Sequence, residues 1–304
     1  MIFKIFSFLF VIFAFVIFAL FETSKIEDHS VFYISDQNLY EIVKNDGAFN
    51  LANGVFFVID NCSNIKSQIK TGEYMINCGD TVIDVVKRMI TKERVRRKLT
   101  IPEGYTIAMI IEKLQQNDLL FGEIEESPKE GSLMPDTYFY HFGDTKQFVV
   151  DLMKNQMKKA LAKLASSNDT KLSIDEIVTI ASIIEKETAL DGERSIVSSV
   201  YHNRLNKKMK LQSCPTVIYA VSQGYGKIGR DLTIEDLKFD SPFNTYVSDG
   251  LPPTAICCPG EKAILAAMKP AQTDHFYFVA KKNGIGHYFS RTYKGHLKNK
   301  NMME

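Results

Sequence analysis

The first 21 residues are almost entirely apolar, and no other feature limits the possible structures of the chain as strongly. Only Lys4 and Ser7 interrupt this run, which extends from Met1 to Phe21. As a helix with a rise of about 1.5 Å per residue, it would span roughly 30 Å, the thickness of the hydrocarbon core of a bilayer. Bulky residues follow Ala19, where a signal peptidase requires small ones. We therefore expect an uncleaved transmembrane signal anchor over residues 1–22 rather than a cleaved signal peptide.

The orientation of this anchor follows from the charge in front of it. Lys4 and the α-amino group precede the span, so the positive-inside rule places the N-terminus in the cytoplasm. No second run of this length follows in the sequence, and we expect everything from about Glu22 onward on the far side. This predicts a single-pass membrane protein, and in a bacterium the far side would be the cell-wall space, where peptidoglycan is abundant. A plain tether for any other extracytoplasmic domain is the alternative.

Composition excludes several classes of protein. Hydrophobic residues make up 45% and charged residues 24% of the 304 residues, as in folded globular proteins. The 37 basic and 36 acidic residues nearly cancel, so no global field favours nucleic acid as a partner. Trp is absent, but 21 Phe and 13 Tyr are enough for a core and for a carbohydrate-binding cleft.

The five cysteines are irregularly spaced, which is not the pattern of a disulfide framework or a zinc site. Cys257 and Cys258 are adjacent, which is poor geometry for a bridge between them. A disulfide between Cys62 and Cys78 stays open as an option in an oxidising compartment.

Residues 31–98 alternate short β-like runs with helical patterns. The apolar run Val55–Ile59 is predicted to be a buried strand, and Gly72–Ile76 a second strand. A helix is predicted to start after Gly79–Thr81, with apolar positions at Val82, Val85, Val86, Met89 and Ile90. These elements predict a small α+β module. The basic run Lys92–Lys98 follows it, and we interpret it as a solvated connection in preference to a contact with anionic lipid or wall polymer.

The rest of the chain reads as a larger, helix-rich α+β region. Ser173 and Glu176 match a capping box. The predicted elements are a strand and turn over residues 99–106, helices over 107–114, 146–165 and 177–188, and a strand over 276–279. Between residue 211 and the last strand, the sequence is punctuated by Pro and Gly and predicts mainly loops.

Two glutamates near the end of the 177–188 helix are candidates for chemistry. Glu185 and Glu187 are two residues apart, about 200° around a helix, so they cannot act together on one bond. Glu187 falls in the apolar stripe, whose members here are Ile180, Ile183 and Ile184, and Glu185 lies on the opposite side. Burial raises the pKa of a carboxyl, as a general acid requires. The alternatives are that Glu187 ends the stripe in solvent or pairs with Arg194.

Polar residues in the following loops suit a sugar polymer. Gln212, Asn244 and Tyr246 carry amide and phenol groups that can bond hydroxyl and N-acetyl groups. We therefore predict these three as substrate-binding residues, although each residue type is more often structural. A metallohydrolase built on His202, His275 or His287 is a further alternative, but these histidines lack a ligand spacing such as H-E-x-x-H.

At these segments the chain resembles a known family. The stretches Ala181–Thr188 and Val200–Leu205 closely resemble the endolytic murein transglycosylases, also called YceG-like proteins. The supporting matches, which extend nearly to the C-terminus, are Glu130–Tyr138, Pro215–Tyr219, Asn244–Tyr246 and Gly250–Pro253.

The resemblance implies a domain order, a reaction and partners. It implies a protein of the bacterial inner membrane with its catalytic domain in the periplasm. The implied order is an anchor over residues 1–22, a LysM-like subdomain over 23–98, a connecting part over 99–168 and a catalytic domain over 169–304. The implied reaction is non-hydrolytic cleavage of nascent peptidoglycan strands between N-acetylmuramic acid and N-acetylglucosamine, which leaves 1,6-anhydro ends. The family's catalytic glutamate aligns with Glu187, as acid and then base. No metal or organic cofactor is implied, and the implied partners are glycan strands and peptidoglycan synthases.

Two positions depart from the family pattern. Cys214 stands where the family usually has an aspartate, and Cys258 stands where it usually has an asparagine. The loss of a carboxylate from the cleft wall keeps a second hypothesis open, a non-catalytic membrane-anchored protein that binds or organises peptidoglycan on the same fold.

Overall fold

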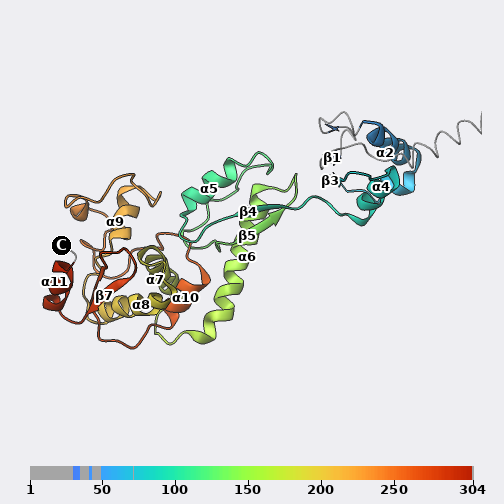
Figure 1. Cartoon of the computed structure of the whole chain (residues 1–304). Coiled ribbons are helices and arrows are strands. Elements are labelled where there is room, and N and C mark those ends of the chain that lie inside the picture. The colour runs from blue at the N-terminus through green and yellow to red at the C-terminus, as the bar shows by residue number, and fades with distance from the viewer. Residues whose placement is uncertain (1–29, 35–40, 43–48, 71, 303–304) are drawn as a thin grey trace, which may run out of the picture. The chain divides into compact units, whose positions relative to one another are not determined.

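The structure is a computed structural model that describes residues 30–34, 41–42, 49–70 and 72–302 (Figure 1). The predicted anchor over residues 1–22 lies outside the described residues. Within the described ranges, no helix is both long enough and apolar enough to cross a bilayer.

The chain divides into two compact units. The first contains Met1–Lys98 and Phe139–Asp144, and the second contains Leu99–Tyr138 and Thr145–Glu304. Apart from Phe139–Asp144, the predicted connecting part therefore lies in the same unit as the predicted catalytic domain. The LysM-like character of the smaller unit stays a prediction.

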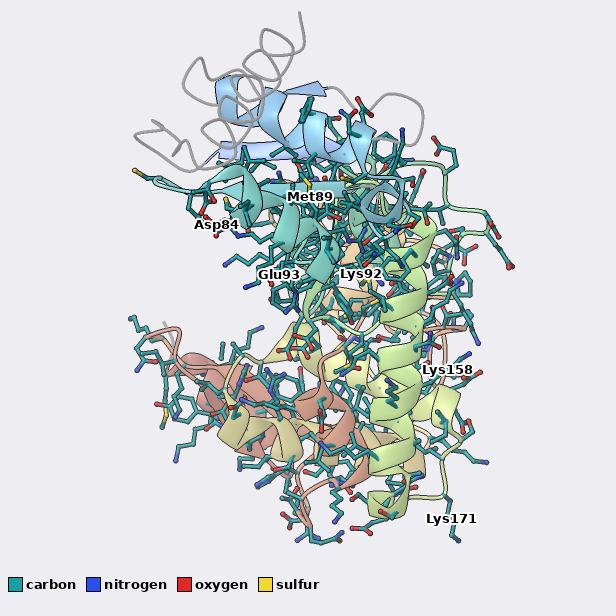
Figure 2. The ribbon with its side chains drawn as sticks, turned by 90° about the vertical axis from the view of Figure 1, so that its right-hand side faces the viewer. Asp84, Met89, Lys92, Glu93, Lys158 and Lys171 are labelled. Carbon is teal, nitrogen blue, oxygen red and sulfur yellow. The ribbon has the colours of Figure 1, made fainter. Side chains whose placement is uncertain are left out.

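In its described residues, the smaller unit has a three-stranded antiparallel sheet and three helices. The strand order is β2-β1-β3, with β1 at Ser30–Ile34, β2 at Glu41–Ile42 and β3 at Gly72–Ile76. The helices are α2 (Phe49–Asn61), α3 (Ser63–Lys66) and α4 (Val82–Thr91). The predictions of β3 and α4 are confirmed, and Met89 of α4 lies fully buried within this unit (Figure 2).

The predicted strand at Val55–Ile59 is wrong, because these residues lie in the middle of α2. Val55 and Ile59 are fully buried while Phe57 is 50% exposed, the pattern of a helix with one face in the core. A five-residue apolar run cannot distinguish a buried strand from a buried helix by its periodicity. Here the i, i+4 spacing of Val55 and Ile59 lets both enter a core shared with α4.

The basic run Lys92–Lys98 is more than a solvated connection. Strand β4 (Arg97–Thr100) begins within it and pairs with β5 (Thr137–Tyr140). The Arg97 guanidinium donates two hydrogen bonds of 2.7 Å to the Glu73 carboxylate. The Arg96 guanidinium lies 4.2 Å from the centre of the Phe139 ring. Two of the charged side chains in the basic run, Arg96 and Arg97, thus have fixed partners within the smaller unit.

Most of the regular secondary structure in the larger unit is helical. Its helices are α5 (Ile107–Gln115), α6 (Lys146–Leu164), α7 (Ile174–Glu187), α8 (Asp191–Asn206), α9 (Cys214–Val221), α10 (Glu261–Met268) and α11 (Tyr293–Asn301). Short 3-10 turns occur at Ala165–Ser167 and Asp236–Lys238. Strands β6 (Tyr277–Ala280) and β7 (His287–Ser290) form an antiparallel hairpin. The predicted helices and the last strand are confirmed, with ends that differ by up to three residues.

Helix α7 lies in the core of the larger unit and packs against α8 and α10 (Figure 1). Every residue from Ile177 to Ile184 is buried. The predicted capping box begins it: the Ser173 hydroxyl accepts from the Glu176 N–H at 3.3 Å, and the Glu176 carboxylate accepts from the Ser173 N–H at 2.8 Å. Glu187 is its last residue, at the point where the helix leaves the core.

Candidate active site

Glu187 lines a cavity of about 380 Å³ in the larger unit. The walls come from α8, the segment before α9, the hairpin β6–β7 and α11. Gln212 and Tyr246 line the same cavity. The structure thus brings together three of the four residues that the sequence predicts for the site.

Two hydroxyl groups hold the Glu187 carboxyl. The Tyr201 Oη of α8 and the Ser213 Oγ both donate to Glu187 Oε1, each at 2.6 Å. No hydrogen bond from another described residue reaches Oε2. One carboxyl oxygen is therefore fixed, and the other is available to a proton or a ligand.

Burial raises the pKa of Glu187 above that of an ordinary glutamate. The hydroxyls of Ser213 and Tyr201 oppose this rise because they stabilise the ionised carboxylate, and the charges of His287 and Arg204 also oppose it. Desolvation is the largest of these effects. The result is a carboxyl that holds its proton to higher pH than a surface glutamate does.

A buried network of threonine hydroxyls fixes the loops around the cavity. The Gln212 N–H donates to the Thr245 carbonyl at 3.0 Å, and the Ser213 N–H donates to Thr245 Oγ1 at 2.9 Å. The Thr216 and Thr245 hydroxyls are 2.9 Å apart and buried. Gln212 has a φ of 50°, a left-handed conformation that these contacts maintain. The network thereby holds the segments that carry Gln212 and Tyr246 against each other.

Arg204 connects these loops to the hairpin. Its Nε donates to the Phe276 carbonyl at 2.7 Å, and its Nη1 donates to the Leu211 carbonyl at 2.8 Å. Its guanidinium lies 5.3 Å from the centre of the Tyr277 ring. Because Arg204 is nearly fully buried, these contacts fix two walls of the cavity relative to each other.

Asn244 lies beneath the loop and is not part of the cavity wall. It is fully buried, and its amide donates to the carbonyls of Leu237 and Phe239 at 3.1 and 2.8 Å. Its Oδ1 accepts from the Tyr246 N–H at 2.9 Å. In this structure, Asn244 fixes the turn that presents Tyr246 to the cavity.

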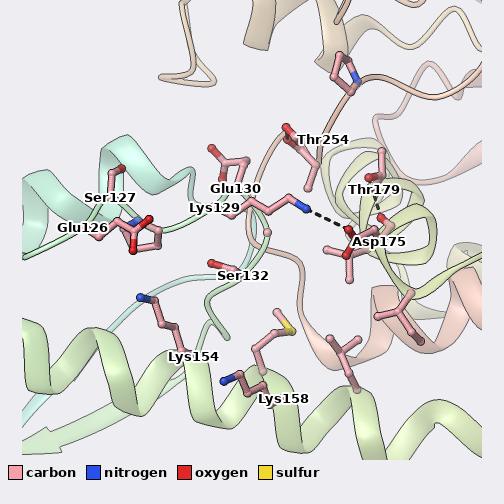
Figure 3. A pocket seen from close by; sticks show the side chains of 18 residues that line it. Glu126, Ser127, Lys129, Glu130, Ser132, Lys154, Lys158, Asp175, Thr179 and Thr254 are labelled. Carbon is pink, nitrogen blue, oxygen red and sulfur yellow. Dashed lines mark hydrogen bonds and ion pairs between the residues drawn. The ribbon is translucent and has the colours of Figure 1, made fainter.

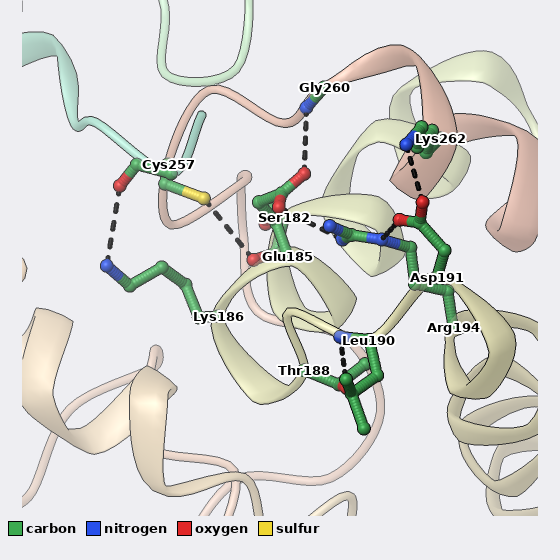
Figure 4. Close-up of polar contacts among 11 residues, drawn as sticks. Ser182, Glu185, Lys186, Thr188, Leu190, Asp191, Arg194, Cys257, Gly260 and Lys262 are labelled. Carbon is green, nitrogen blue, oxygen red and sulfur yellow. Dashed lines mark hydrogen bonds and ion pairs between the residues drawn. The ribbon is translucent and has the colours of Figure 1, made fainter. Parts of the chain in front are cut away.

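Glu185 lies in a separate polar cluster, which Figure 4 shows. It accepts from Arg194 Nη1 at 3.0 Å and from the Gly260 N–H at 2.9 Å. The Glu185 and Arg194 side chains are 6% and 7% exposed. The alternative pairing of Arg194 with Glu187 is therefore wrong. Glu185 instead joins α7 to α8 and to the turn before α10.

The cysteines have different environments. Cys62 and Cys78 are free and exposed, so the disulfide left open between them is not formed. Cys214 lines the cavity, and its Sγ lies 3.3 Å from Tyr246 Oη. Cys257 and Cys258 are buried, and burial raises the pKa of the Cys258 thiol to about 12.

The three histidines of the metallohydrolase alternative have separate partners. His202 Nε2 lies 3.0 Å from the Ala267 carbonyl, and His287 Nδ1 lies 2.7 Å from the Glu193 carboxylate. His275 stacks on Phe289. In the part of the chain that the structure describes, no three His, Cys, Asp or Glu side chains form a group that could hold a metal ion.

A second cavity of about 360 Å³ lies between α6, the start of α7 and the 126–132 loop (Figure 3). Lys129 and Asp175 form an ion pair of 3.0 Å at its edge. Burial raises the pKa of Glu130 to about 7, although its carboxylate accepts from the Ile107 N–H and the Tyr219 hydroxyl. None of the predicted site residues lines this cavity.

The residues that tune and enclose Glu187 were not predicted from the sequence. Tyr201 lies in the matched stretch Val200–Leu205, and Ser213 directly follows Gln212, but no spacing rule connects either residue to Glu187. Tyr277, Tyr293 and His296 come from elements 90 or more residues further along the chain, and only the folded structure places them at the same cavity.

The sequence matches the YceG-like family over residues 34–302. The chain belongs to this family. An endolytic murein transglycosylase of Bacillus subtilis is 38% identical over 188 residues, which are 60% of this chain and 50% of that protein. One of Streptococcus pneumoniae is 28% identical over 281 residues, 77% of this chain and 50% of that protein. The chain thus spans about half the length of these relatives.

A solved structure has the same fold. A YceG-like protein from Listeria monocytogenes matches with a TM-score of 0.57 and 28% identity, covering 90% of this chain and 99% of that one. The mixed α+β architecture is therefore that of the YceG-like family.

The buried pair of Glu185 and Arg194 generates a first prediction. Replacement of Arg194 by Met leaves a buried carboxylate without its partner, so the free energy of unfolding should fall by about 3 kcal/mol or more. The matched control is Lys163→Met, which breaks the exposed pair with Glu261 and should cost less than about 1 kcal/mol. Urea denaturation of the full chain measures both, and equal losses would contradict the argument.

The hydroxyl donors to Glu187 generate a second prediction. Ser213→Ala removes a hydrogen bond that favours the ionised form, so the pKa of Glu187 should rise further. Titration of the Glu187 side-chain carboxyl by ¹³C NMR measures this pKa, and the Glu187 signal is identified as the one that Glu187→Gln lacks. Ser248→Ala, which removes a hydroxyl that donates to the Ser241 carbonyl, is the control. An unchanged or lower pKa in Ser213→Ala would contradict the account.

Proposed function

We propose that this protein is a lytic transglycosylase that cleaves glycan strands of peptidoglycan, with Glu187 as its acid and base. The observation that carries the proposal is a carboxyl with a raised pKa at a cavity, fixed through Oε1 and open at Oε2. The relatives named as endolytic murein transglycosylases support the choice of substrate and reaction.

The proposed reaction needs one carboxyl and no water. Protonated Glu187 donates its proton to the glycosidic oxygen, and the bond from that oxygen to C1 of N-acetylmuramic acid breaks. The 6-hydroxyl oxygen of the same sugar forms a new bond to C1. Its proton passes to the Glu187 carboxylate, which restores the acid and leaves a 1,6-anhydro end. This differs from glycoside hydrolysis by two carboxyls, in which water is consumed.

The surroundings of Glu187 suit both halves of this cycle. Burial favours the protonated form that starts the reaction. The hydroxyls of Tyr201 and Ser213 stabilise the carboxylate that exists between the two proton transfers. Removal of either hydroxyl should therefore slow the reaction even though Glu187 remains.

Gln212 and Tyr246 are the proposed substrate-binding residues at this cavity. Their amide and phenol groups can bond sugar hydroxyl and N-acetyl groups beside Glu187. The predicted role of Asn244 becomes indirect in this proposal, because its contacts fix the turn of Tyr246.

The proposal includes a place in the cell. An anchor over residues 1–22 in the bacterial inner membrane, with the N-terminus in the cytoplasm, would hold the two folded units in the periplasm. There the enzyme would meet nascent strands beside the peptidoglycan synthases that make them, and the smaller unit would be the LysM-like part. Co-purification of the full chain without any synthase would argue against this partnership.

A non-catalytic protein that binds or organises peptidoglycan is the second candidate. Cys214 favours it, because this thiol lines the cavity where the family usually has a carboxylate. The replacement of the aspartate by Cys214 leaves Glu187 and its two hydroxyl donors in place, so we prefer the proposal that the protein is an enzyme.

The test uses the full chain in detergent with uncrosslinked glycan strands and mass spectrometry of the products. The wild type should produce 1,6-anhydro ends, and Glu187→Gln should lower the rate at least about hundredfold, because general acids contribute at least this much. The rate should fall as pH rises through the pKa of Glu187, since the acid form is then lost. Glu112→Gln, an exposed glutamate on α5, is the control and should keep full activity.

Other products would contradict the proposal in different ways. Reducing ends would identify a hydrolase with a second carboxyl. Folded wild-type protein that binds strands without cleaving them would favour the scaffold.

A further inference from the structure

Three aromatic rings from the C-terminal part of the chain meet at the wall of the Glu187 cavity. Tyr277 lies on β6, and Tyr293 and His296 lie on α11. The Tyr277 and His296 rings stack with centroids 5.5 Å apart. Tyr293 lies 5.9 Å from Tyr277 and 6.3 Å from His296. We call these three residues the aromatic wall.

The aromatic wall is not an ordinary piece of core. Helix α11 has no buried residue, and the Tyr293 side chain is 60% exposed. His296 Nδ1 is buried and has no hydrogen-bond partner among the described residues. A core contact would bury the rings and satisfy this nitrogen. The wall instead leaves the aromatic surface of Tyr293 exposed and one buried ring nitrogen without a partner among the described residues.

The chemistry of this surface selects a type of ligand. Aromatic faces bind flat apolar surfaces, and a pyranose presents such a surface in its axial C–H groups. Burial lowers the pKa of His296, and the nearby charges of Lys300 and Arg204 act in the same direction. The neutral imidazole has one donor and one acceptor, which match the hydroxyl and acetamide groups of an N-acetylated sugar.

We propose that Tyr277, Tyr293 and His296 form a subsite that binds one N-acetylhexosamine ring of a glycan strand beside Glu187. The choice of a glycan as the ligand rests on the proposed function. The subsite is a binding site, however, and it can bind a sugar whether or not the strand is cleaved. A stem peptide is the other candidate occupant of an aromatic wall, and the test separates the two.

Ligand binding should also order α11. Helix α11 has nine residues, none of them buried, and it is held mainly by partly exposed contacts with β6 and β7. A sugar ring packed on Tyr293 and His296 would add to the contacts that these two rings already make with Tyr277 of β6. Amide hydrogen exchange in α11 should therefore slow when glycan is bound.

The test measures binding with the full chain carrying Glu187→Gln, which does not consume the ligand. Calorimetry with glycan strands stripped of their peptides should show about tenfold weaker binding for Tyr293→Ala, the effect expected from losing one ring contact. Tyr293→Phe should bind normally because it keeps the ring. Tyr225→Ala is the matched control, a tyrosine 51% exposed that does not line the cavity. Free stem peptide should not bind.

Several results would overturn the subsite. They are equal affinity of Tyr293→Ala and the control, no binding of stripped strands, binding of the peptide alone, or unchanged amide hydrogen exchange in α11.

Failure of the proposed function would give a different set of results. If the wild-type protein never forms 1,6-anhydro ends but its glycan affinity depends on Tyr293, the subsite is supported and the proposed reaction is wrong. If the wild type forms 1,6-anhydro ends and Tyr293→Ala binds and cleaves like the wild type, the reaction is supported and the subsite is wrong.

Discussion

The burial of helix α7 is the constraint on which the rest of the site depends. Because every residue from Ile177 to Ile184 is buried, the helix has a fixed position and so does its last residue, Glu187. The carboxyl emerges where the helix leaves the core, so it is desolvated but still reaches a cavity. The negative end of the helix dipole also lies there and disfavours a carboxylate further. One packing arrangement thus determines both the place of the proposed acid and its affinity for a proton.

Two glutamates on this helix have different tasks because their neighbours differ. Glu185 has a permanent cation, Arg194, and a backbone N–H from the turn before α10, so it serves as a structural link. Glu187 has only neutral hydroxyl donors, and both of them bind the same oxygen. A nearby guanidinium bonded to Glu187 would hold it ionised and remove the acid. Arg194 bonds Glu185 and Asp191 instead, so its guanidinium does not hold Glu187 ionised.

Local patterns in the sequence predicted a good part of this arrangement. The capping box at Ser173 and the apolar stripe of α7 are local features, and they were enough to separate Glu187 from Glu185. Val55–Ile59 was mispredicted because a short apolar run fits a helix as well as a strand. Tyr201, Ser213 and the aromatic wall could not be predicted, because their meeting depends on the packing of distant segments. Asn244 belonged to a recognisable motif, but only its buried hydrogen bonds revealed that it supports a turn.

The central claim is that one carboxyl both gives and recovers the proton while water stays out of the reaction. The most direct measurement is to carry out the cleavage in water enriched in ¹⁸O and to determine the mass of the newly formed ends by mass spectrometry. The account predicts ends without ¹⁸O, lighter by one water than hydrolysed ends, because the sugar's own 6-hydroxyl closes on C1. Incorporation of one ¹⁸O atom at each new end would contradict it, since water would then be the nucleophile and a second group would have to activate it.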